Sequence, residues 1–277
     1  MNVSIFIQTL NEEVNLPECL KSVSFSDDIV VLDSFSTDRT EEIARSAGAR
    51  FFQRKYDGRA ANQNWAVENI PFKYPWVYYS DADEVVMTEL RDEILRVVTD
   101  QRREEVVYRL RYKNMFMGRW NKHSSMYPTW VPRLFRPECI RWDRGANPVP
   151  IISGKVGLLQ GHFLHYSFNK GMAAWFEKHN KYSNFEAYET MKELKSGTLR
   201  WQDLVIGSAA NRRQALKKLS FRLPARPLAK FMYMYFARGG CLDGVAGLHY
   251  CLLQSVYEYM ITIKVRELTL RERGEAL

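Results

Sequence analysis

The chain of 277 residues is long enough for one large domain, or for a domain with an appendage. Its net charge of +8 favours an anionic partner such as a phosphorylated substrate, an acidic lipid or a nucleic acid. The four cysteines show neither the spacing of a metal site nor a disulfide framework, which argues against a disulfide-stabilised secreted protein. The first residues lack a basic segment followed by a long apolar one, so we expect no signal peptide and a cytoplasmic protein.

The first hundred residues alternate short apolar runs with polar loops and helix-like segments. We expect strands over residues 3–7, 29–32, 50–52 and 76–79. We expect helices over about residues 14–23, 40–47 and 62–69. Apolar runs without polar interruption are typical of parallel strands that are covered on both faces. The pattern therefore predicts an α/β fold, a Rossmann-like and mostly parallel central sheet with helices on both faces.

Polar residues follow three of these strands directly. Thr9 and Asp33 come at the ends of the first two strands, and the fourth strand runs into Asp81-Ala82-Asp83. Ligands of such sheets bind beyond the carboxyl ends of the strands, so we expect these residues to line one cleft. There the backbone of Thr9 and the carboxylate of Asp33 are well placed to hydrogen-bond the edge of a uracil-type base.

The two carboxylates of Asp81 and Asp83 are two residues apart, directly after a strand. Mg²⁺ and Mn²⁺ prefer oxygen ligands, usually one or two carboxylates together with substrate phosphates. A cation held there would neutralise a diphosphate leaving group. The alternative is a polar strand end that only caps the next helix.

The segment before the fourth strand adds further candidates. Arg59 and Gln63 are expected to contact a diphosphate or sugar hydroxyls. For Asn64, local hydrogen bonding at the start of a helix is as good an interpretation as ligand contact. Asp38 is interpreted as the N-cap of the helix that begins near Arg39.

The pattern changes after about residue 105. We expect strands over residues 105–111, 151–152 and 161–166 as additions to the sheet, and a helix over residues 171–194. Trp120, with Tyr127 and Trp130, is a candidate acceptor platform, although core packing explains these aromatic side chains equally well.

Three basic residues in this half are candidates for ligand contact. Arg133 and Arg136 are of a type that binds phosphate oxygens through two hydrogen bonds. His165 comes at an expected strand end, where its imidazole could complete a metal site or contact the diphosphate. The alternative for His165 is a structural, hydrogen-bonded side chain.

The chain from about residue 201 is basic and amphipathic. Its basic residues are Arg212, Arg213, Lys217, Lys218, Arg222, Arg226 and Lys230. An aromatic run over residues 231–236 and an apolar segment over residues 245–263 follow, and the latter is too polar to be a confident spanning helix. We expect a catalytic domain over residues 1–200, with a nucleotide-binding half (1–100) and an acceptor half (101–200), followed by a helical extension (201–277). The extension fits a membrane surface, with a helical cap as the alternative.

These motifs, in this order, resemble family 2 glycosyltransferases, and most of all the bacterial lipopolysaccharide-core and exopolysaccharide enzymes of the WaaE/LgtF kind. The motifs are Thr9-Leu10-Asn11-Glu12-Glu13, residues 30–40, Asn64 and Asp81-Ala82-Asp83-Glu84. The match covers roughly residues 1–100 well, and residues 118–167 less tightly. The resemblance implies a GT-A fold, a nucleotide-sugar donor, a divalent metal and an inverting displacement.

The resemblance also implies roles for single residues. The family aspartate that corresponds to Asp33 contacts the base, the one that corresponds to Asp83 binds metal, and the one that corresponds to Asp81 more often meets the ribose or the sugar. Asn11, Glu12 and Ala82 lie within the same motifs and belong to the expected donor site.

An inverting transfer needs a general base that deprotonates the acceptor hydroxyl. Relatives often carry a His-Glu pair after the segment that corresponds to residues 133–136, but here that stretch reads Arg144-Gly145-Ala146-Asn147-Pro148. Asp143 is the first candidate and Glu138 the second. The alternative for Asp143 is a surface ion pair with Arg141 or Arg144.

The sequence therefore predicts an enzyme that moves a sugar from a nucleotide diphosphate sugar, with uridine as the favoured nucleoside and Mg²⁺ or Mn²⁺ as cofactor. The expected acceptor is a lipid-linked saccharide or a lipopolysaccharide or exopolysaccharide, at the inner face of the cytoplasmic membrane. A sugar-phosphate nucleotidyltransferase is the enzymatic alternative, but residues 8–13 lack the glycine-rich, basic loop that it needs. A non-catalytic basic protein that binds membrane or nucleic acid would leave the acidic strand ends unexplained.

Overall fold

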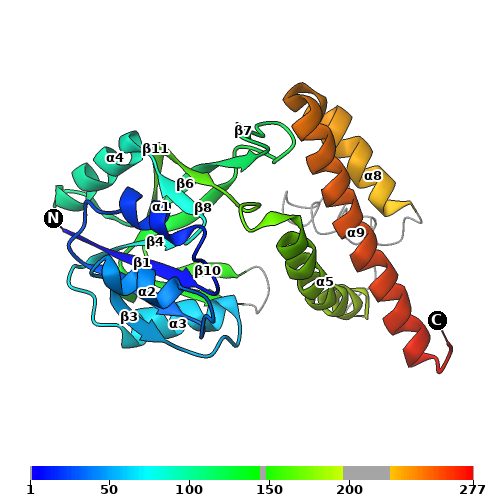
Figure 1. The fold of residues 1–277 in the computed structure, drawn as a ribbon, viewed down its shortest axis with the longest axis horizontal. Helices are drawn as coiled ribbons and strands as arrows, with labels where there is room; N and C mark the ends of the chain where they lie inside the picture. The colour runs from blue at the N-terminus through cyan, green and yellow to red at the C-terminus, as the bar shows by residue number, and fades with distance from the viewer. Residues whose placement is uncertain (1, 144–147, 196–224, 277) are drawn as a thin grey trace. The chain divides into compact units, whose positions relative to one another are not determined.

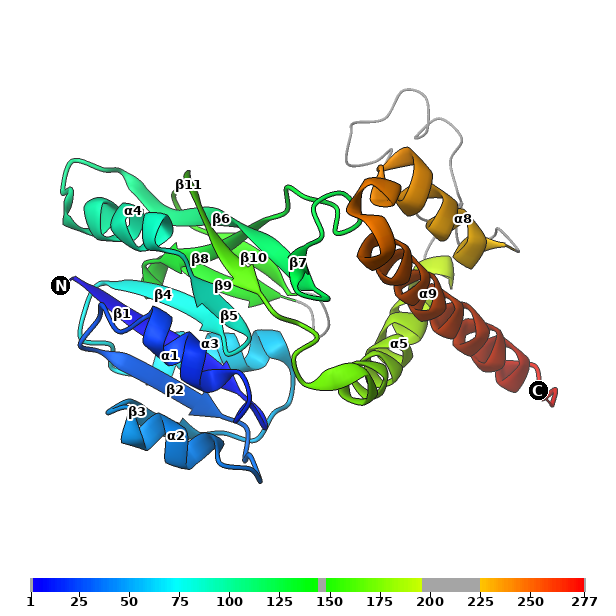
Figure 2. The same cartoon turned by 45° about the horizontal axis from the view of Figure 1, so that its top comes forward.

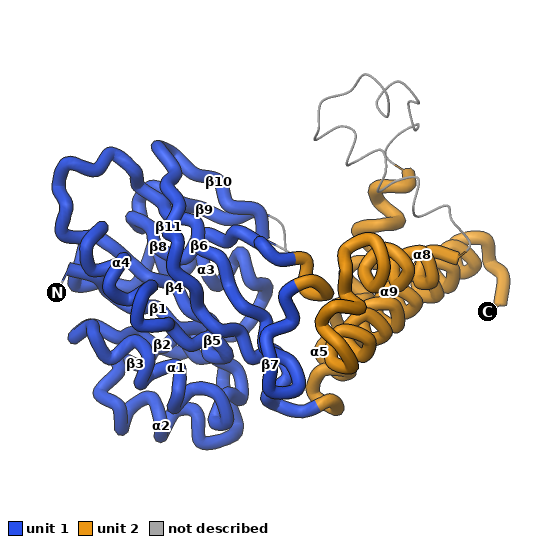
Figure 3. The backbone as a smooth tube through the Cα atoms, turned by 90° about the horizontal axis from the view of Figure 1, so that it is seen from above, with its two compact units in different colours: residues 1–122, 127–171 blue, residues 123–126, 172–277 orange. Residues whose placement is uncertain are grey.

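The computed structural model describes residues 2–143, 148–195 and 225–276. The chain forms two compact units, residues 1–122 with 127–171 and residues 123–126 with 172–277 (Figure 3). The first unit ends at Gly171, whereas the expected domain boundary at residue 200 lies outside the described residues. Most of the expected basic series, from Arg212 to Arg222, also lies outside them.

The first unit is built on one large mixed sheet (Figures 1 and 2). Its strands, in spatial order, are β3 (Arg50–Gln53), β2 (Ile29–Asp33), β1 (Val3–Thr9), β4 (Trp76–Asp81), β8 (Trp130–Phe135), β6 (Glu105–Phe116), β11 (Lys155–His165) and β5 (Glu84–Val86). Strand β7 (Arg119–Trp120) pairs with β6. Strands β1 to β4 are parallel to one another, and β8 is antiparallel to its neighbours β4 and β6. The predicted rhythm of strands in the first hundred residues is therefore confirmed.

Helices cover both faces of this sheet, as predicted. They are α1 (Leu16–Ser22), α2 (Thr40–Ser46), α3 (Arg59–Asn69) and α4 (Thr88–Thr99). Asp38 bonds the start of α2, since the backbone N–H of Thr40 donates to its carboxylate at 3.0 Å. The expected strand at residues 151–152 was wrongly assigned to the main sheet. It is part of β10 (Val149–Ile152), which pairs with β9 (Ile140–Asp143) in a separate two-stranded sheet.

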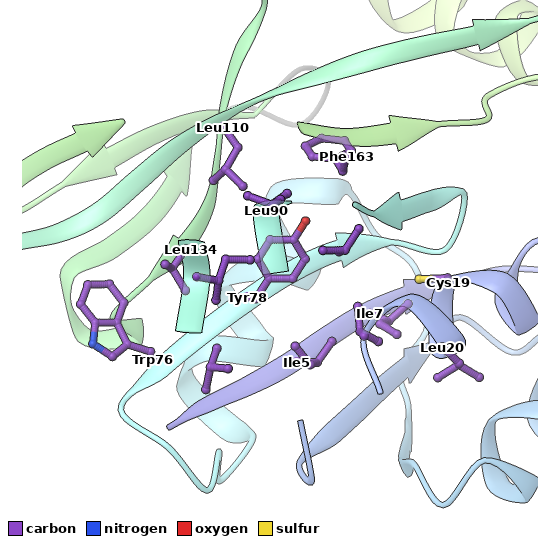
Figure 4. Close-up of a cluster of buried hydrophobic side chains, with 14 of the residues drawn as sticks. Ile5, Ile7, Cys19, Leu20, Trp76, Tyr78, Leu90, Leu110, Leu134 and Phe163 are labelled. Carbon is purple, nitrogen blue, oxygen red and sulfur yellow. The ribbon is translucent and has the colours of Figure 1, made fainter. Parts of the chain in front are cut away.

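Two hydrophobic clusters cover the two faces because every other side chain of the central strands points the same way. Ile5 and Ile7 point toward α1, α2 and α4 and lie with Tyr78 in one cluster (Figure 4). Phe6 points toward α3 and lies with Tyr79 in the other. Each of these side chains is at most 1% exposed. Burial of each such side chain stabilises the fold by about 1.5–3 kcal/mol. It therefore holds in place the strands whose ends carry the polar residues.

The second unit contains α5 (Gly171–Lys195), α8 (Arg226–Met232), a π-helical turn (Tyr233–Ala237), a 3-10 turn (Gly240–Asp243) and α9 (Gly244–Glu272). The turn before α9 is tight, since a Cβ atom on Gly247 would collide with the carbonyl oxygen of Gly240. The Asp243 carboxylate fixes it further by accepting hydrogen bonds from the backbone of His123 and Ser124. Among the described residues, none of the helices combines the length and the apolar character needed to cross a bilayer.

Candidate active site

The carboxyl ends of three adjacent parallel strands bring the predicted acidic residues to one edge of the sheet. In the register of the sheet, Thr9 of β1 lies beside Asp33 of β2, and Gln8 lies beside Asp81 of β4. Neighbouring strands are about 4.8 Å apart, so these side chains lie close together across the three adjacent strands β2, β1 and β4. Asp83 follows in the turn between β4 and β5.

The Asp33 carboxylate is fully buried within a network of hydroxyl and amide donors. The Thr9 hydroxyl donates to one of its oxygens at 2.8 Å, and the backbone N–H of Ser36 donates to the other at 2.8 Å. The Ser36 hydroxyl also donates to Asp33, at 2.5 Å. A carboxylate has about four acceptor positions, so these three bonds leave about one of them unused.

Two loops meet over this carboxylate. The backbone N–H of Asn11 donates to the Ser36 hydroxyl at 2.7 Å, and the backbone N–H of Thr37 donates to the Asn11 side chain at 2.8 Å. Asn11 and Phe35 both have positive φ angles, 53° and 62°. Asn adopts this conformation readily, but for a bulky residue such as Phe35 it is uncommon and costs about 1–3 kcal/mol. The cross-loop hydrogen bonds hold the conformation in place.

Lys170 ties the loop after β1 to the segment that follows β11. Its ammonium donates to the carbonyl oxygens of Leu10 and Asn11, at 3.0 and 2.8 Å, and to the Glu12 carboxylate at 2.6 Å. Burial raises the pKa of Glu12, and the hydrogen bond from Lys170 opposes that rise. Lys170 was not among the predicted site residues, because no local pattern relates residues that are about 160 positions apart.

Asp81 is held between two arginines and a tyrosine. Arg59, at the start of α3, donates to its carboxylate at 2.5 Å, and Arg133 of β8 donates to the same oxygen at 2.8 Å. The Tyr79 hydroxyl donates to the other oxygen at 2.5 Å. Burial acts to raise the pKa of Asp81, but the two guanidinium groups outweigh it and hold that pKa well below its usual range. Asp81 is therefore ionised and fixed in orientation.

Glu84 shares Arg133 with Asp81. It is buried at the start of β5, and Arg133 donates to it at 2.5 Å. Burial raises the pKa of Glu84 to about 7 despite this partner. The Arg133 guanidinium also lies over the Tyr79 ring, 4.5 Å from its centre. Arg133 was predicted to bind phosphate. Here it sits at the site but faces inward, with its side chain 9% exposed.

The face of α3 that carries Arg59 also carries Gln63, one turn further along. Gln63 is 3% exposed, and its carbonyl oxygen has no hydrogen-bond partner within the described structure. A buried polar atom of this kind is costly unless a ligand or water satisfies it. Asn64 instead makes two hydrogen bonds to the backbone of Trp142 in β9, both at 2.8 Å, so its amide is engaged in structure. Ala82 is buried in the turn after β4.

Asp83 and His165 form a second pair at this edge. The carboxylate and the imidazole Nε2 are 3.4 Å apart, and both side chains are partly exposed. His165 ends β11, and the adjacent backbone N–H of Tyr166 donates to the Asp83 carbonyl at 2.8 Å, which fixes the pair. Burial acts to lower the pKa of His165, but the Asp83 carboxylate raises it above the ordinary value.

This pair fits a divalent cation. Across residues 2–143, 148–195 and 225–276, no three His, Cys, Asp or Glu side chains gather as a metal-binding cluster. Mg²⁺ nevertheless keeps several waters in most enzymes and is bound through one or two carboxylates plus substrate phosphates. Imidazole also suits first-row transition metals. One carboxylate and one imidazole, both partly exposed at this edge of the sheet, match that requirement.

The candidate base lies on a different element. Asp143 is exposed at the end of β9, directly after the Trp142 backbone that Asn64 holds. Residues 144–147 lie outside the described structure, and with them Arg144, one of its alternative partners. The other, Arg141, pairs with Glu68 at 3.2 Å. Glu138 lies in the short turn before β9.

The acceptor candidates lie in two places. Trp120 of β7 pairs with Met115 of β6, and it packs edge-on against Tyr127 with ring centres 5.1 Å apart. Strand β6 also pairs with β11 at His165, so Trp120 lies within about two strand spacings, roughly 10 Å, of the Asp83–His165 pair. Arg136 instead stacks on Trp76, at the opposite end of β4 from Asp81.

Residues 4–160, more than half of the chain, match the family model described as Glycosyl transferase family 2. The chain belongs to this family. An uncharacterized glycosyltransferase of Rickettsia bellii is 33% identical over 97% of this chain and 87% of its own length. The lipopolysaccharide core biosynthesis glycosyltransferase LpsC of Rhizobium meliloti is 28% identical over 95% of this chain and 91% of its own length. A crystal structure of S. aureus TarS 1-349 aligns with 99% of this chain and 92% of that chain at 14% identity, with a TM-score of 0.46.

Family membership confirms two expectations from the sequence. The chain is a glycosyltransferase, and its resemblance to family 2 is genuine. The observed sheet, with helices on both faces and helices toward the C-terminus, agrees with the GT-A fold class that the resemblance implied.

Proposed function

We propose that this glycosyltransferase moves a sugar from a uridine diphosphate sugar, with inversion and with Mg²⁺ or Mn²⁺, to a lipid-linked saccharide or a lipopolysaccharide or exopolysaccharide acceptor. The observation that carries the proposal is the row of groups at one sheet edge: buried Asp33, then Asp81 between two arginines, then the Asp83–His165 pair. Each group suits a different part of a nucleotide sugar.

The base end of the donor is assigned to Asp33. Its remaining acceptor position suits the single ring N–H of uracil, and the Thr9 and Ser36 donors keep the carboxylate oriented. The hydrogen bonds between the loops of Asn11 and Phe35 organise this end before the nucleotide arrives, which reduces the ordering cost of binding.

The diphosphate end is assigned to Arg59, Asp83 and His165. Arg59 is partly exposed and presents a planar fork of donors that matches phosphate oxygens. Asp81, held by Arg133 and Tyr79, accepts hydrogen bonds from ribose or sugar hydroxyls. A divalent cation bound by Asp83 and His165 would supply positive charge to the departing diphosphate.

The acceptor end is assigned to Asp143 and Trp120. Asp143 is exposed at the end of β9, and its carboxylate is assigned the role of taking the proton from an acceptor hydroxyl as that oxygen attacks the anomeric carbon. Trp120 is partly exposed, and its ring is assigned as the surface on which an acceptor sugar stacks. The relative LpsC is named for lipopolysaccharide core biosynthesis, which supports an acceptor of this class.

Calorimetric titration with UDP, with and without Mn²⁺, tests the donor assignment. We expect binding that strengthens with Mn²⁺ and is competed by a UDP-sugar. Binding of a nucleoside triphosphate in preference to UDP would favour nucleotidyl transfer instead. An absence of UDP binding under both conditions would contradict the proposal.

A further inference from the structure

Helix α9 has three faces, and the first packs against α5 within the second unit. The Lys264 ammonium donates to the side chains of Asn180 and Ser183, each at 2.7 Å. Tyr257 packs edge-on against His179, with ring centres 4.9 Å apart. Burial raises the pKa of Tyr257, with Glu186 and Glu258 as smaller causes, which agrees with a covered side of the helix.

The second face of α9 packs against α8. The Ser255 hydroxyl donates to the carbonyl oxygen of Pro227 at 2.7 Å. Glu258 pairs with Arg226 at 2.5 Å, and both side chains are largely buried. Between Val245 and Arg266 the sequence contains no other acidic residue, so the single carboxylate of this stretch is directed to α8.

The third face of α9 is an apolar stripe that is exposed to solvent. Its five large side chains, between 38% and 65% exposed, are Val245, Leu252, Val256, Tyr259 and Ile263. At about 100° per residue they fall within an arc of roughly 60°, and they extend over about 27 Å. The exposed face of a helix in a soluble protein normally carries polar residues. These five residues are called the outer stripe. Their apolar side chains are typical of a surface that another molecule covers.

The charges around the outer stripe favour one kind of cover. His249 and Arg266 are exposed and lie at the two margins of the same arc. The half-buried residues that flank the arc, Leu248, Leu253 and Met260, are apolar. Pairing with a second helix normally uses charged flanking residues of both signs. An anionic lipid surface suits the features found here: an apolar stripe with a tyrosine and no carboxylate inside its arc, and Arg266 at one margin. The nearest carboxylate, Glu267, lies one turn beyond Ile263 at the other margin and is paired with Arg271 at 2.5 Å.

We propose that the outer stripe lies along an anionic lipid surface, with α9 parallel to the membrane plane and its side chains inserted among the headgroups. The inference deepens the proposed function and rests on it, because a lipid-linked acceptor requires the enzyme at a membrane. The net charge of +8 adds long-range attraction to such a surface.

Co-sedimentation of the full chain with phosphatidylcholine vesicles, with and without phosphatidylglycerol, tests the proposal. The test variant is Leu252→Asp with Val256→Asp, which places two carboxylates in the middle of the outer stripe. The control is Val156→Asp, which charges an exposed apolar position on β11 of the first unit. We expect the wild type and the control to bind phosphatidylglycerol vesicles. We expect the affinity of the double variant for these vesicles to be at least about tenfold lower.

Two outcomes would overturn the inference. One is vesicle binding by the double variant that equals that of the wild type. The other is a wild type that ignores vesicles but sediments as a dimer that the double variant dissociates, which would make the outer stripe a protein interface. Mn²⁺-dependent UDP binding, measured on the same preparations, separates this result from the proposed function. If all variants still bind UDP, their donor site is intact and any loss of vesicle binding concerns the outer stripe. If the wild type binds vesicles but not UDP, the result counts against the proposed function alone.

Discussion

Replacing Arg133 by Met removes the shared partner of two buried carboxylates. Asp81 keeps Arg59 and Tyr79, but Glu84 loses the strongest donor that it has in the described structure. Removing one member of a buried ion pair costs about 3–5 kcal/mol, because the remaining charge is left without compensation. For a unit of this size each kcal/mol corresponds to about 2–4 °C in the thermal midpoint, so we expect a decrease of about 10 °C.

A matched control is Arg50→Met. Arg50 pairs with Asp28 at 2.8 Å, and the Arg50 side chain is 37% exposed whereas that of Asp28 is 4% exposed. Asp28 also keeps the backbone N–H of Lys73 as a donor at 2.8 Å. Because Asp28 also keeps the Ser4 hydroxyl as a donor, we expect Arg50→Met to cost about 1–2 kcal/mol, less than Arg133→Met. Circular dichroism of thermal unfolding measures both variants.

A double-mutant cycle separates the ion pair from simple packing. Glu84→Gln removes the buried charge, so adding it to Arg133→Met should restore part of the lost stability, with a coupling energy of about 1–3 kcal/mol. If Arg133→Met unfolds within a degree or two of Arg50→Met, or if the two substitutions at Arg133 and Glu84 are additive, the account of this ion pair is refuted.

Three further predictions concern other parts of the chain. Asp83→Ala should reduce turnover at least about a hundredfold while leaving the thermal midpoint unchanged, and unchanged turnover would contradict the metal role. Lys170→Met should loosen the loop after β1, because it removes a charge-assisted hydrogen bond worth about 1.5–3 kcal/mol. We expect the KM for the donor to rise about tenfold, with a smaller effect on kcat. An unchanged KM in steady-state kinetics would exclude this role of Lys170. Gly247→Ala should destabilise the protein by about 1–3 kcal/mol in urea unfolding because of the clash with Gly240, whereas helix propensity alone predicts a gain of about 1 kcal/mol.

The edge of the sheet was predictable from the sequence because it depends on local patterns. Uninterrupted apolar runs define buried strands, and polar residues directly after them lie at the carboxyl edge of a parallel sheet. Thr9, Asp33 and Asp81 are adjacent there for that reason. The sequence also indicated His165 at a strand end, where the structure brings it to within 3.4 Å of Asp83.

What the sequence did not indicate depends on long-range pairing. Arg133 reaches Asp81 and Glu84 because β8 inserts antiparallel beside β4, a register that no local pattern specifies. Arg136 was interpreted by its residue type and lies at the other end of β4. Asn64, for which a helix-start bond and a ligand contact were both left open, bonds instead to the backbone of β9. The pairing of β10 with β9 was also not predictable, since its apolar residues are compatible with either the main sheet or the separate two-stranded sheet.

The most direct test is a crystal structure with UDP and Mn²⁺, with the metal located by its anomalous scattering. The account predicts a single strong peak within about 2.2 Å of the Asp83 carboxylate and of the His165 imidazole, with the pyrophosphate on its other side and the uracil at Asp33. A metal peak away from Asp83, or UDP bound elsewhere than at this edge of the sheet, would contradict it.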